Sequence, residues 1–246
     1  MAGAIHIGTS GWHYQHWKGP FYPERLPAST MLDFYARHFD TVELNSTFYR
    51  LPLETGLDNW RESTPKGFIF AAKGSRFITH MKKLKDPETA IAKYFERVER
   101  LGKKLGPIVF QTPPWWEANL ERLETFLAAL PRGHRYAFEL RNPTWHTPDV
   151  YRLLRRRNAA FCIFEIAGFH SPFEVTADFT YVRLHGPGGA YQGSYPAETL
   201  SAWSERIRTW QRELRAVYMY FDNDQSAYAV ENALVLKRLV ARRRAA

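Results

Sequence analysis

The segment YAFELRNPTWH, from Tyr136 to His146, places an acidic and a basic side chain two residues apart in a predicted strand. Successive side chains of a strand point to opposite faces, so residues two apart share a face. Glu139 and Arg141 therefore point the same way. Because an unpaired buried ion is costly, a carboxylate and a guanidinium on one strand face indicate a site that handles charge.

Other predicted strands carry polar side chains at equivalent late positions. These are Glu43, Asn45, Lys73, Gln111, Glu165, Arg183, His185 and Asp222. A salt-bridge network that serves only as architecture would use the same residue types. Since the charged members come from six predicted strands, we favour a ligand site.

The cations in this set predict a site for an anion. Arg141 and Arg183 can each bind a phosphate or carboxylate through two hydrogen bonds, and Lys73 adds a point charge. The loop HGPGGAYQGSYP after the seventh predicted strand is rich in glycine, as a phosphate-binding loop or a flexible lid would be. Trp12 and Tyr191 lie in loops, where they can stack on bases or sugars or pack the loops onto the core.

His185 is the candidate general acid or base, because the ordinary pKa of histidine lies near neutrality. The alternative is a histidine that serves only as a hydrogen-bond partner. Glu43 and Glu139 would carry protons or, with Asp222, hold a divalent metal such as Mg²⁺ or Mn²⁺. The histidines show no H-x-x-x-H or H-E-x-x-H spacing, so no cofactor is specified and the metal question stays open.

Eight short apolar segments could position these residues. They are Ile5–Thr9, Thr41–Asn45, Phe68–Lys73, Pro107–Gln111, Arg135–Leu140, Ala160–Glu165, Phe179–His185 and Ala216–Phe221. Helical patterns follow at residues 29–39, 86–102, 118–131, 147–158, 196–214 and 227–240, with Ser29, Asp86 and Thr147 as capping candidates. The stretch 166–178 is predicted to hold only a turn.

This alternation over about 250 residues predicts an α/β fold, a TIM-like (β/α)8 barrel that forms a single domain over residues 1–246. An open doubly wound sheet is the rival, but the G-x-G-x-x-G turn typical of it is absent after the first strand. In a barrel the carboxyl ends of the strands form one mouth, where we expect the polar side chains to converge.

Composition narrows the class of protein further. The net charge of +9, from 34 basic and 25 acidic residues, favours anionic partners in general. The single cysteine, Cys162, cannot form an internal disulfide, which suits a reducing compartment. No apolar run approaches the roughly 18 residues of a membrane span, and the start lacks a signal-peptide pattern. We expect a cytoplasmic protein without a membrane partner, and the pattern leaves its oligomeric state open.

Seven segments resemble the YecE-like family, the domain of unknown function 72. They are IGTSGWHYQHWKGPFYP, VELNSTFYR, FAAKGSRFITH, VFQTPPWW, FELRNPTW, YVRLHG and YFDNDQSAYAVENA. The resemblance covers essentially the whole chain and implies a TIM-like barrel, without an established activity. Members have been compared with endonuclease IV-like barrels, an analogy of fold that implies nucleic acid as a ligand class.

The resemblance also marks individual positions. The matching residues are Glu43, Asn45, Lys73, Gln111, Glu139, Arg141, Arg183, His185 and Asn223. The chain departs from the family pattern at Asp222, where asparagine is frequent, and at Glu165, where a shorter acid is commoner.

These observations predict an enzyme that binds a phosphate-bearing ligand, with nucleotide or nucleic acid preferred, and performs acid–base or hydrolytic chemistry on it. The predicted catalytic residues are Glu43, Glu139 and His185, and the predicted ligand-binding residues are Trp12, Asn45, Lys73, Gln111, Arg141, Arg183, Tyr191 and Asn223. One alternative is a non-catalytic nucleic-acid-binding protein. Another is a metal-free sugar-phosphate isomerase or lyase in which Lys73 forms a Schiff base.

Overall fold

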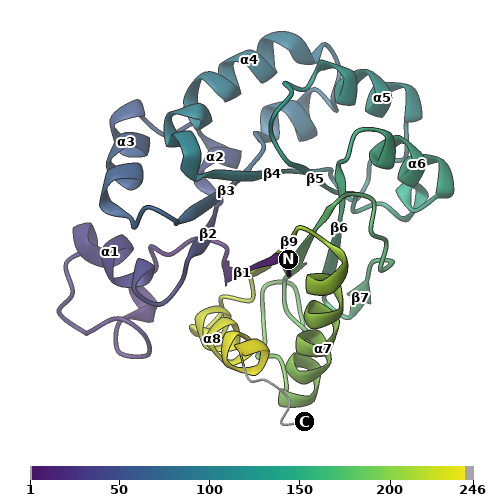
Figure 1. Cartoon of the computed structure of the whole chain (residues 1–246). Coiled ribbons are helices and arrows are strands. Elements are labelled where there is room, and N and C mark those ends of the chain that lie inside the picture. Colours follow the sequence, from purple (N-terminus) through teal and green to yellow (C-terminus); the bar gives the residue numbers. More distant parts are fainter. Residues whose placement is uncertain (1, 242–246) are drawn as a thin grey trace. The chain divides into compact units, whose positions relative to one another are not determined.

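Parallel strands and helices alternate along the computed structural model, which describes residues 2–241 (Figure 1). The strands are β1 (Ala4–Thr9), β2 (Thr41–Leu44), β3 (Ile69–Lys73), β4 (Leu105–Gln111), β5 (Tyr136–Glu139), β6 (Ala160–Ile166), β8 (Phe179–Leu184) and β9 (Ala216–Phe221). Their order is β1-β9-β8-β6-β5-β4-β3-β2. This is the predicted TIM-like (β/α)8 barrel, and each predicted strand is confirmed to within two residues at either end.

The helices that were predicted are present, and three further helices of four residues or more were not predicted. The helices are α1 (Met31–Ala36), α2 (Ser46–Tyr49), α3 (Glu54–Ser63), α4 (Pro87–Val98), α5 (Leu120–Ala129), α6 (Pro148–Arg156), α7 (Ala197–Glu213) and α8 (Tyr228–Ala241). Short 3₁₀ helices lie at Gln15–Trp17, Ala28–Thr30, Glu99–Lys104 and Pro143–Trp145. These three helices are α2, α3 and a π-helix, η3 (Phe77–Met81).

Of the three predicted helix caps one is confirmed, and the segment predicted as a turn contains a short strand. Thr147 caps α6 as predicted, because its side chain accepts a hydrogen bond from the Val150 amide. Ser29 and Asp86 do not cap: Ser29 lies inside a 3₁₀ helix, and Asp86 adopts a left-handed φ of 43° with no capping bond. The stretch predicted as a turn holds β7 (Phe169–His170), which pairs antiparallel with β6.

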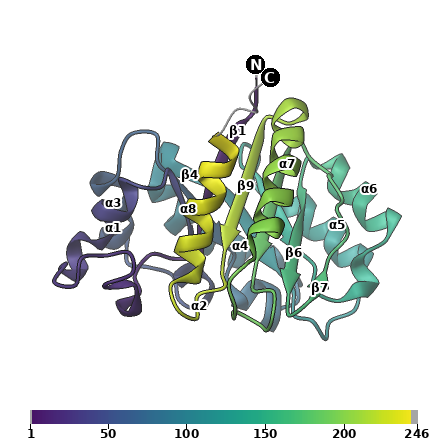
Figure 2. The ribbon, with the colours of Figure 1, turned by 90° about the horizontal axis from the view of Figure 1, so that it is seen from below.

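Packing divides the chain into two compact units, which we describe separately. Unit 1 comprises Met1–Val42, Ile163–Ser171 and Phe179–Ala246, and unit 2 comprises Glu43–Cys162 and Pro172–Asp178. Unit 1 includes β1, β8 and β9, with α7 and α8 packed along β9 (Figure 2). Unit 2 includes β3, β4 and β5. A single domain over residues 1–246 stays a prediction.

In unit 1, the two ends of the strand order approach each other at Gly8 of β1 and Thr41 of β2. A Cβ atom at Gly8 would lie 2.4 Å from the Thr41 carbonyl oxygen, so only glycine allows this approach. The hydroxyl of buried Tyr35 accepts a hydrogen bond from the Thr9 amide at 3.0 Å and donates one to the Thr41 carbonyl at 3.1 Å. One side chain therefore ties the first strand to the second.

In unit 2, an aromatic layer packs on the helix-facing side of β4 and β5. Phe110 lies edge-on to Phe126 of α5, with ring centroids 4.9 Å apart, and Phe138 lies 5.6 Å from Phe110. The strand register pairs Gln111 with Glu139. Since neighbours along a strand alternate in direction, burial of the phenylalanines against α5 turns Gln111 and Glu139 to the opposite face.

None of the helices within residues 2–241 has both the length and the apolar character needed to span a membrane.

Candidate functional site

Unit 2 gathers polar side chains at the carboxyl ends of its strands, and we name Lys73, Gln111, Glu139 and Arg141 the β3–β5 cluster. Glu139 is fully buried, and its Oε1 accepts a hydrogen bond of 2.6 Å from Arg141 Nε. The Arg141 side chain is 12% exposed. The predicted pairing of these two residues on one face is confirmed, and it compensates the charge of the buried carboxylate.

Backbone contacts fix the positions of the cluster. The Thr112 amide donates to the Glu139 carbonyl at 3.0 Å, while Thr112 Oγ1 accepts from the Arg141 amide at 3.3 Å. The Lys73 carbonyl accepts from Thr47 Oγ1 at 2.6 Å and from the Tyr94 hydroxyl at 3.1 Å. The Lys73 ammonium lies 4.4 Å from the centre of the Phe48 ring, a cation–π contact.

His80 of η3 belongs to the same region, although it was not among the predicted site residues. Burial lowers the pKa of His80, and the positive charges of Lys73, Arg141 and Arg76 lower it further, against a smaller opposing effect of Glu139. The imidazole lies edge-on to Phe48 at 5.1 Å. Burial and the three neighbouring cations thus both disfavour the charged form of the His80 imidazole. The signal that could have found His80 is its place in the basic segment KGSRFITHMKKLKD.

Glu43 and Asn45 come from the end of the neighbouring strand, β2. Glu43 is fully buried, and β2 pairs next to β3 in the strand order. Asn45 is the residue that precedes α2 and makes no capping bond to it. Glu43 thus lies on the strand beside the one that carries Lys73, and Asn45 follows directly after the end of that strand.

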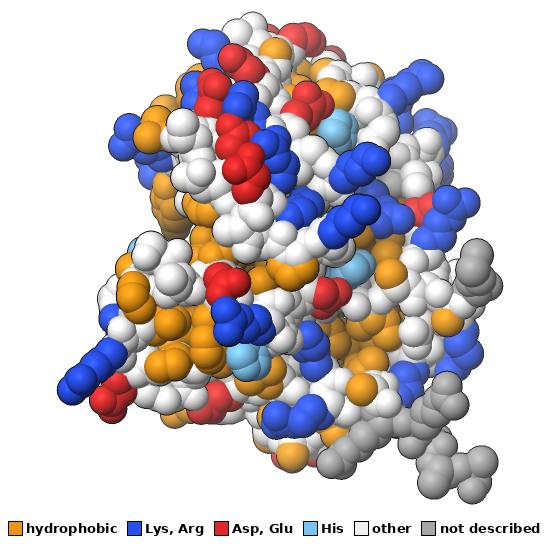
Figure 3. Space-filling view, turned by 60° about the vertical axis from the view of Figure 1, so that its left-hand side comes forward, with side chains coloured by type: hydrophobic (Ala, Val, Ile, Leu, Met, Phe, Trp, Pro, Cys, Tyr) orange, Lys and Arg blue, Asp and Glu red, His pale blue; other side chains and the backbone are white. Residues whose placement is uncertain are grey.

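The loop after β4 presents one exposed aromatic residue, Trp115, and is tied to the loop after β5. The Trp115 ring is 62% exposed, and Lys83 Nζ lies 4.5 Å from its centre. Asn142 Nδ2 donates to the Pro114 carbonyl at 2.8 Å, which ties the Trp115 loop to the loop that carries Arg141. Figure 3 shows lysine and arginine side chains interspersed with apolar ones over one face of the molecule.

Unit 1 holds a second set of polar residues, Ser10, Arg183, His185 and Asp222, which we name the β8–β9 cluster. Arg183 is fully buried, and its NH2 group donates to Asp222 Oδ2 at 3.1 Å and to Ser10 Oγ at 3.3 Å. His185, also fully buried, places Nδ1 3.0 Å from the same Asp222 oxygen. His185 Nε2 lies 3.4 Å from Arg183 NH1, a group that can only donate. A neutral ring that donates from Nδ1 to Asp222 and accepts at Nε2 satisfies both contacts.

Three other predicted ligand-binding residues lie in unit 1. The Tyr191 ring, 43% exposed, lies edge-on to His185 at 5.5 Å. Asn223 Nδ2 donates to the Gly193 carbonyl and to Asn232 Oδ1, so it anchors the loop after β8. Trp12 is half-buried, and its carbonyl accepts from the Tyr22 hydroxyl. Tyr191 thus neighbours the cluster, whereas Asn223 makes contacts typical of loop support.

Asp224, two residues after Asp222, is a buried acid that the sequence prediction did not include. Burial, with a smaller effect from Asp222, raises the pKa of Asp224 to about 6. Trp17 Nε1 donates to its Oδ1 at 2.6 Å, and His16 Nε2 lies 3.0 Å from its Oδ2. Its contacts come from residues more than 200 positions away in the chain, so no local pattern could have indicated them.

The acids predicted as metal ligands divide between the units. Glu43 and Glu139 belong to unit 2, whereas Asp222 belongs to unit 1 and contacts Arg183 and His185. Within residues 2–241 no group of three or more His, Cys, Asp or Glu side chains could hold a metal ion. Glu165 of β6 lies 3.6 Å from His170, and burial raises the pKa of Glu165. Metal dependence, and convergence of both clusters at one mouth, stay predictions.

Comparison with known proteins agrees with the class of fold, a TIM-like barrel with polar residues at the ends of its strands. A solved structure of a DUF72 family protein from Thermotoga maritima superposes with a TM-score of 0.88 at 27% identity, covering 97% of this chain and all of that one. Another, from Enterococcus faecalis, gives a TM-score of 0.83 at 20% identity, over 97% of this chain and 96% of that one.

Sequence comparison gives the family. Residues 6–246 match the model of the family described as "Protein of unknown function DUF72", so the chain belongs to that family. The UPF0759 protein YunF of Bacillus subtilis is 24% identical, over 96% of this chain and 94% of its own length. The UPF0759 protein YecE of Escherichia coli K12 is 33% identical over 56% of this chain, a match that spans about half of that protein. The resemblance found in the sequence is confirmed.

Proposed function

We propose that this protein binds a phosphate-bearing ligand, with single-stranded nucleic acid preferred, through the β3–β5 cluster and the exposed ring of Trp115. The observation that carries the proposal is the contact of Lys83 with Trp115, beside loops that also hold Arg141. An exposed aromatic ring offers a face for a base, and cations around it offer partners for the flanking phosphates.

The electrostatics of unit 2 support an anion at this place. Burial lowers the pKa of His80, and the charges of Lys73, Arg141 and Arg76 lower it further, so the negative charge of a bound phosphate would be favourable there. Arg141 is held through its Nε by Glu139, which fixes the plane of the guanidinium. A guanidinium in a fixed orientation suits the planar, two-bonded recognition of phosphate oxygens.

Binding of a fluorescently labelled oligothymidylate, followed by anisotropy over a range of salt concentrations, tests the proposal. We expect affinity to fall as salt rises, and Arg141→Gln to flatten the logarithmic slope by about 0.7, the value for one phosphate contact on a single strand. Trp115→Ala should cost about 1–3 kcal/mol of binding, and Trp115→Phe less, because phenylalanine keeps a ring for stacking.

Lys66→Gln is the matched control, since Lys66 is an exposed lysine of unit 2 outside the cluster. It should leave both affinity and slope close to those of the unmodified protein. Oligonucleotide binding that is absent at low salt, or that Arg141→Gln and Trp115→Ala leave unchanged, would contradict the proposal.

A second candidate function, phosphoester hydrolysis, is favoured by one observation in unit 1. Asp222 lies 3.0 Å from His185 Nδ1, the arrangement by which an acid orients a histidine for acid–base work. This function requires His185 Nε2 to exchange its contact with Arg183 NH1 for one with substrate. Hydrolysis of bis(p-nitrophenyl) phosphate, lost in His185→Gln and shifted in pH profile by Asp222→Asn, would support this function. Equal turnover by the folded His185→Gln protein would exclude His185 from the chemistry.

A further inference from the structure

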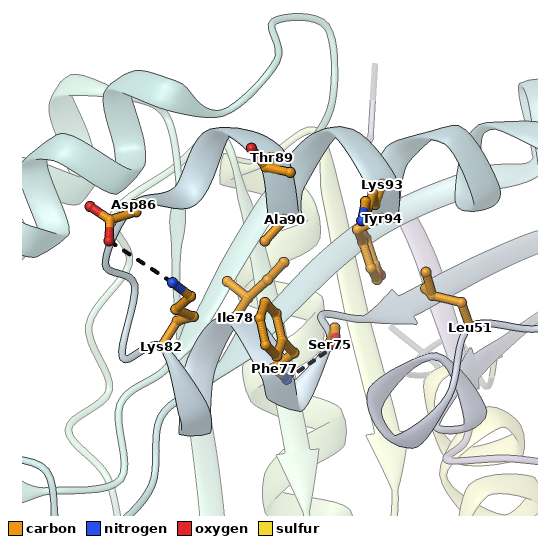
Figure 4. Close-up of a pocket in the computed structure, with 10 residues that line it drawn as sticks. All are labelled: Leu51, Ser75, Phe77, Ile78, Lys82, Asp86, Thr89, Ala90, Lys93 and Tyr94. Atoms are coloured by element: carbon orange, nitrogen blue, oxygen red, sulfur yellow. Dashed lines mark hydrogen bonds and ion pairs between the residues drawn. The ribbon is translucent and has the colours of Figure 1, made fainter.

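Unit 2 contains a cavity that none of the predicted site residues lines. Its volume is about 460 Å³, and it lies between η3, α4 and Leu51 (Figure 4). Cavities of about 300–1,000 Å³ are typical of sites for small molecules. The size of this cavity therefore suits a ligand larger than a water molecule or an ion.

The floor of the cavity is apolar. Phe77 and Ile78 of η3 and Ala90 and Tyr94 of α4 point toward one another in Figure 4, with Leu51 beside them. The Tyr94 hydroxyl is directed away, because it donates to the Lys73 carbonyl at 3.1 Å. Tyr94 and Ile78 are buried, whereas Phe77 is 44% exposed and supplies most of the accessible aromatic surface of the cavity. An apolar ring fits such a lining.

The charge at the rim is positive. Lys82 and Lys93 both line the cavity, together with one acid, Asp86. Lys82 Nζ lies 3.9 Å from Asp86, so these two charges offset each other. Lys93, on the same side as Tyr94, is exposed and makes no ion pair with any residue that the structure describes. The rim therefore offers one cation for an anionic group.

The chain that frames the cavity has an unusual backbone. Lys83, Leu84 and Asp86, in the connection from η3 to α4, have φ values of 49°, 61° and 43°. Left-handed conformations cost free energy in residues other than glycine, and they persist where the surrounding structure imposes them. A π-helix next to this connection is likewise rare and frequent at functional sites. Both features agree with a built site rather than a chance gap.

We propose that this cavity binds a small aryl carboxylate, with the ring against Phe77, Ile78 and Tyr94 and the carboxylate on Lys93. A carboxylate is favoured over a phosphate because a single lysine, without an arginine, matches one negative charge. None of the residues that line the cavity belongs to the β3–β5 cluster, so binding of an aryl carboxylate can be tested apart from binding of nucleic acid.

Titration of the ¹⁵N-labelled protein with 4-phenylbutyrate, followed by amide chemical shifts, tests the proposal. We expect saturable shifts at Phe77, Ile78, Ala90 and Tyr94 with a dissociation constant of about 1 mM, the value usual for a ligand of this size. The neutral amide of the same acid and phenyl phosphate should both bind more weakly. Absence of saturable shifts, equal binding of the amide or tighter binding of phenyl phosphate would overturn the proposal.

Two pairs of variants locate the site. Ala90→Leu fills the cavity and should abolish binding, whereas Ala92→Leu makes the same change at an exposed position of α4 and should not. Lys93→Gln should weaken binding about threefold, the effect of one exposed ion pair, and Lys66→Gln should not. Unchanged affinity in a folded Ala90→Leu protein would overturn the proposal. If Ala90→Leu does not fold, equal affinities of Lys93→Gln and Lys66→Gln for 4-phenylbutyrate would overturn the proposal.

Discussion

Arg183 is a buried cation, so the residues around it must include an acid and hydrogen-bond acceptors. The guanidinium is fully buried and contacts Asp222, Ser10 and His185. Such an ion is tolerated because the carboxylate of Asp222 offsets its charge. The Arg183–Asp222 pair thus gives the β8–β9 cluster a fixed geometry before any ligand is considered.

Asp222→Asn should be strongly destabilising, because it removes the negative charge that Arg183 faces. We expect a loss of about 3 kcal/mol in the free energy of unfolding, measured by urea denaturation at neutral pH. Asp149→Asn, which breaks the exposed ion pair between Arg152 and Asp149 on α6, is the control and should cost under about 0.5 kcal/mol. Equal losses in the two variants would contradict this account.

Asp224 should make the stability of the protein fall with pH. Its pKa rises from 3.8 to about 6 on folding, so between these values the folded state holds the extra proton. The stabilisation is present in full below pH 3.8 and is lost as the pH rises through about 6. Asp224→Asn keeps an acceptor for Trp17 and has no charge to bury.

The measurement is the difference in unfolding free energy between Asp224→Asn and the unmodified protein at pH 4 and pH 7. From pH 4 to pH 7 we expect the unfolding free energy of the variant to rise by about 1–2 kcal/mol relative to that of the unmodified protein. This is less than the full pKa shift of Asp224 corresponds to, because solvent screens part of the carboxyl. A difference that does not change with pH would show that Asp224 has an ordinary pKa.

At the scale of elements, the strands were the most predictable feature and the short helices the least. Strands that form short continuous apolar runs, such as Ala160–Ile166, are visible in the sequence. The helix α3 was missed because its residues include Gly56, Asp58 and Asn59, and only Leu57 is buried. The π-helix η3 was missed because five residues do not show a helical period.

Gly8→Ala tests the close approach of β1 and β2. The new Cβ would lie 2.4 Å from the Thr41 carbonyl oxygen, a backbone atom that cannot move aside cheaply. We expect a loss of about 3 kcal/mol or more in thermal or denaturant unfolding. Gly188→Ala is the control, since nothing lies within 4 Å of a Cβ there. A Gly8→Ala protein as stable as the control would show that the two strands are not in contact.

At the scale of the whole molecule, the buried charged residues could be predicted from the sequence. The residues that pair with them across strands could not. Alternation within a single strand predicted that Glu139 and Arg141 share a face, and likewise Arg183 and His185. Both pairs are in contact. Asp222 was predicted as a ligand only in the case that a divalent metal binds, and local alternation did not indicate its contacts with Arg183 of β8 and with His185 just after it. Contacts across strands depend on register, which local patterns do not specify.

The net charge of +9 gives the molecule a general preference for anions, and the β3–β5 cluster is where we expect that preference to become a site. The net positive charge alone would attract an oligonucleotide without changing the pKa of any particular residue. A bound phosphate beside Lys73, Arg141 and Arg76 would instead offset the positive charges that lower the pKa of His80.

The most direct measurement is therefore the pKa of His80, obtained from its imidazole NMR signals with and without a saturating oligothymidylate at one salt concentration. We expect the pKa of His80 to rise when the oligonucleotide is bound, while the signals of the exposed His38 in unit 1 stay unchanged. A saturated complex in which the pKa of His80 is the same as in the free protein would contradict binding of phosphate at the β3–β5 cluster.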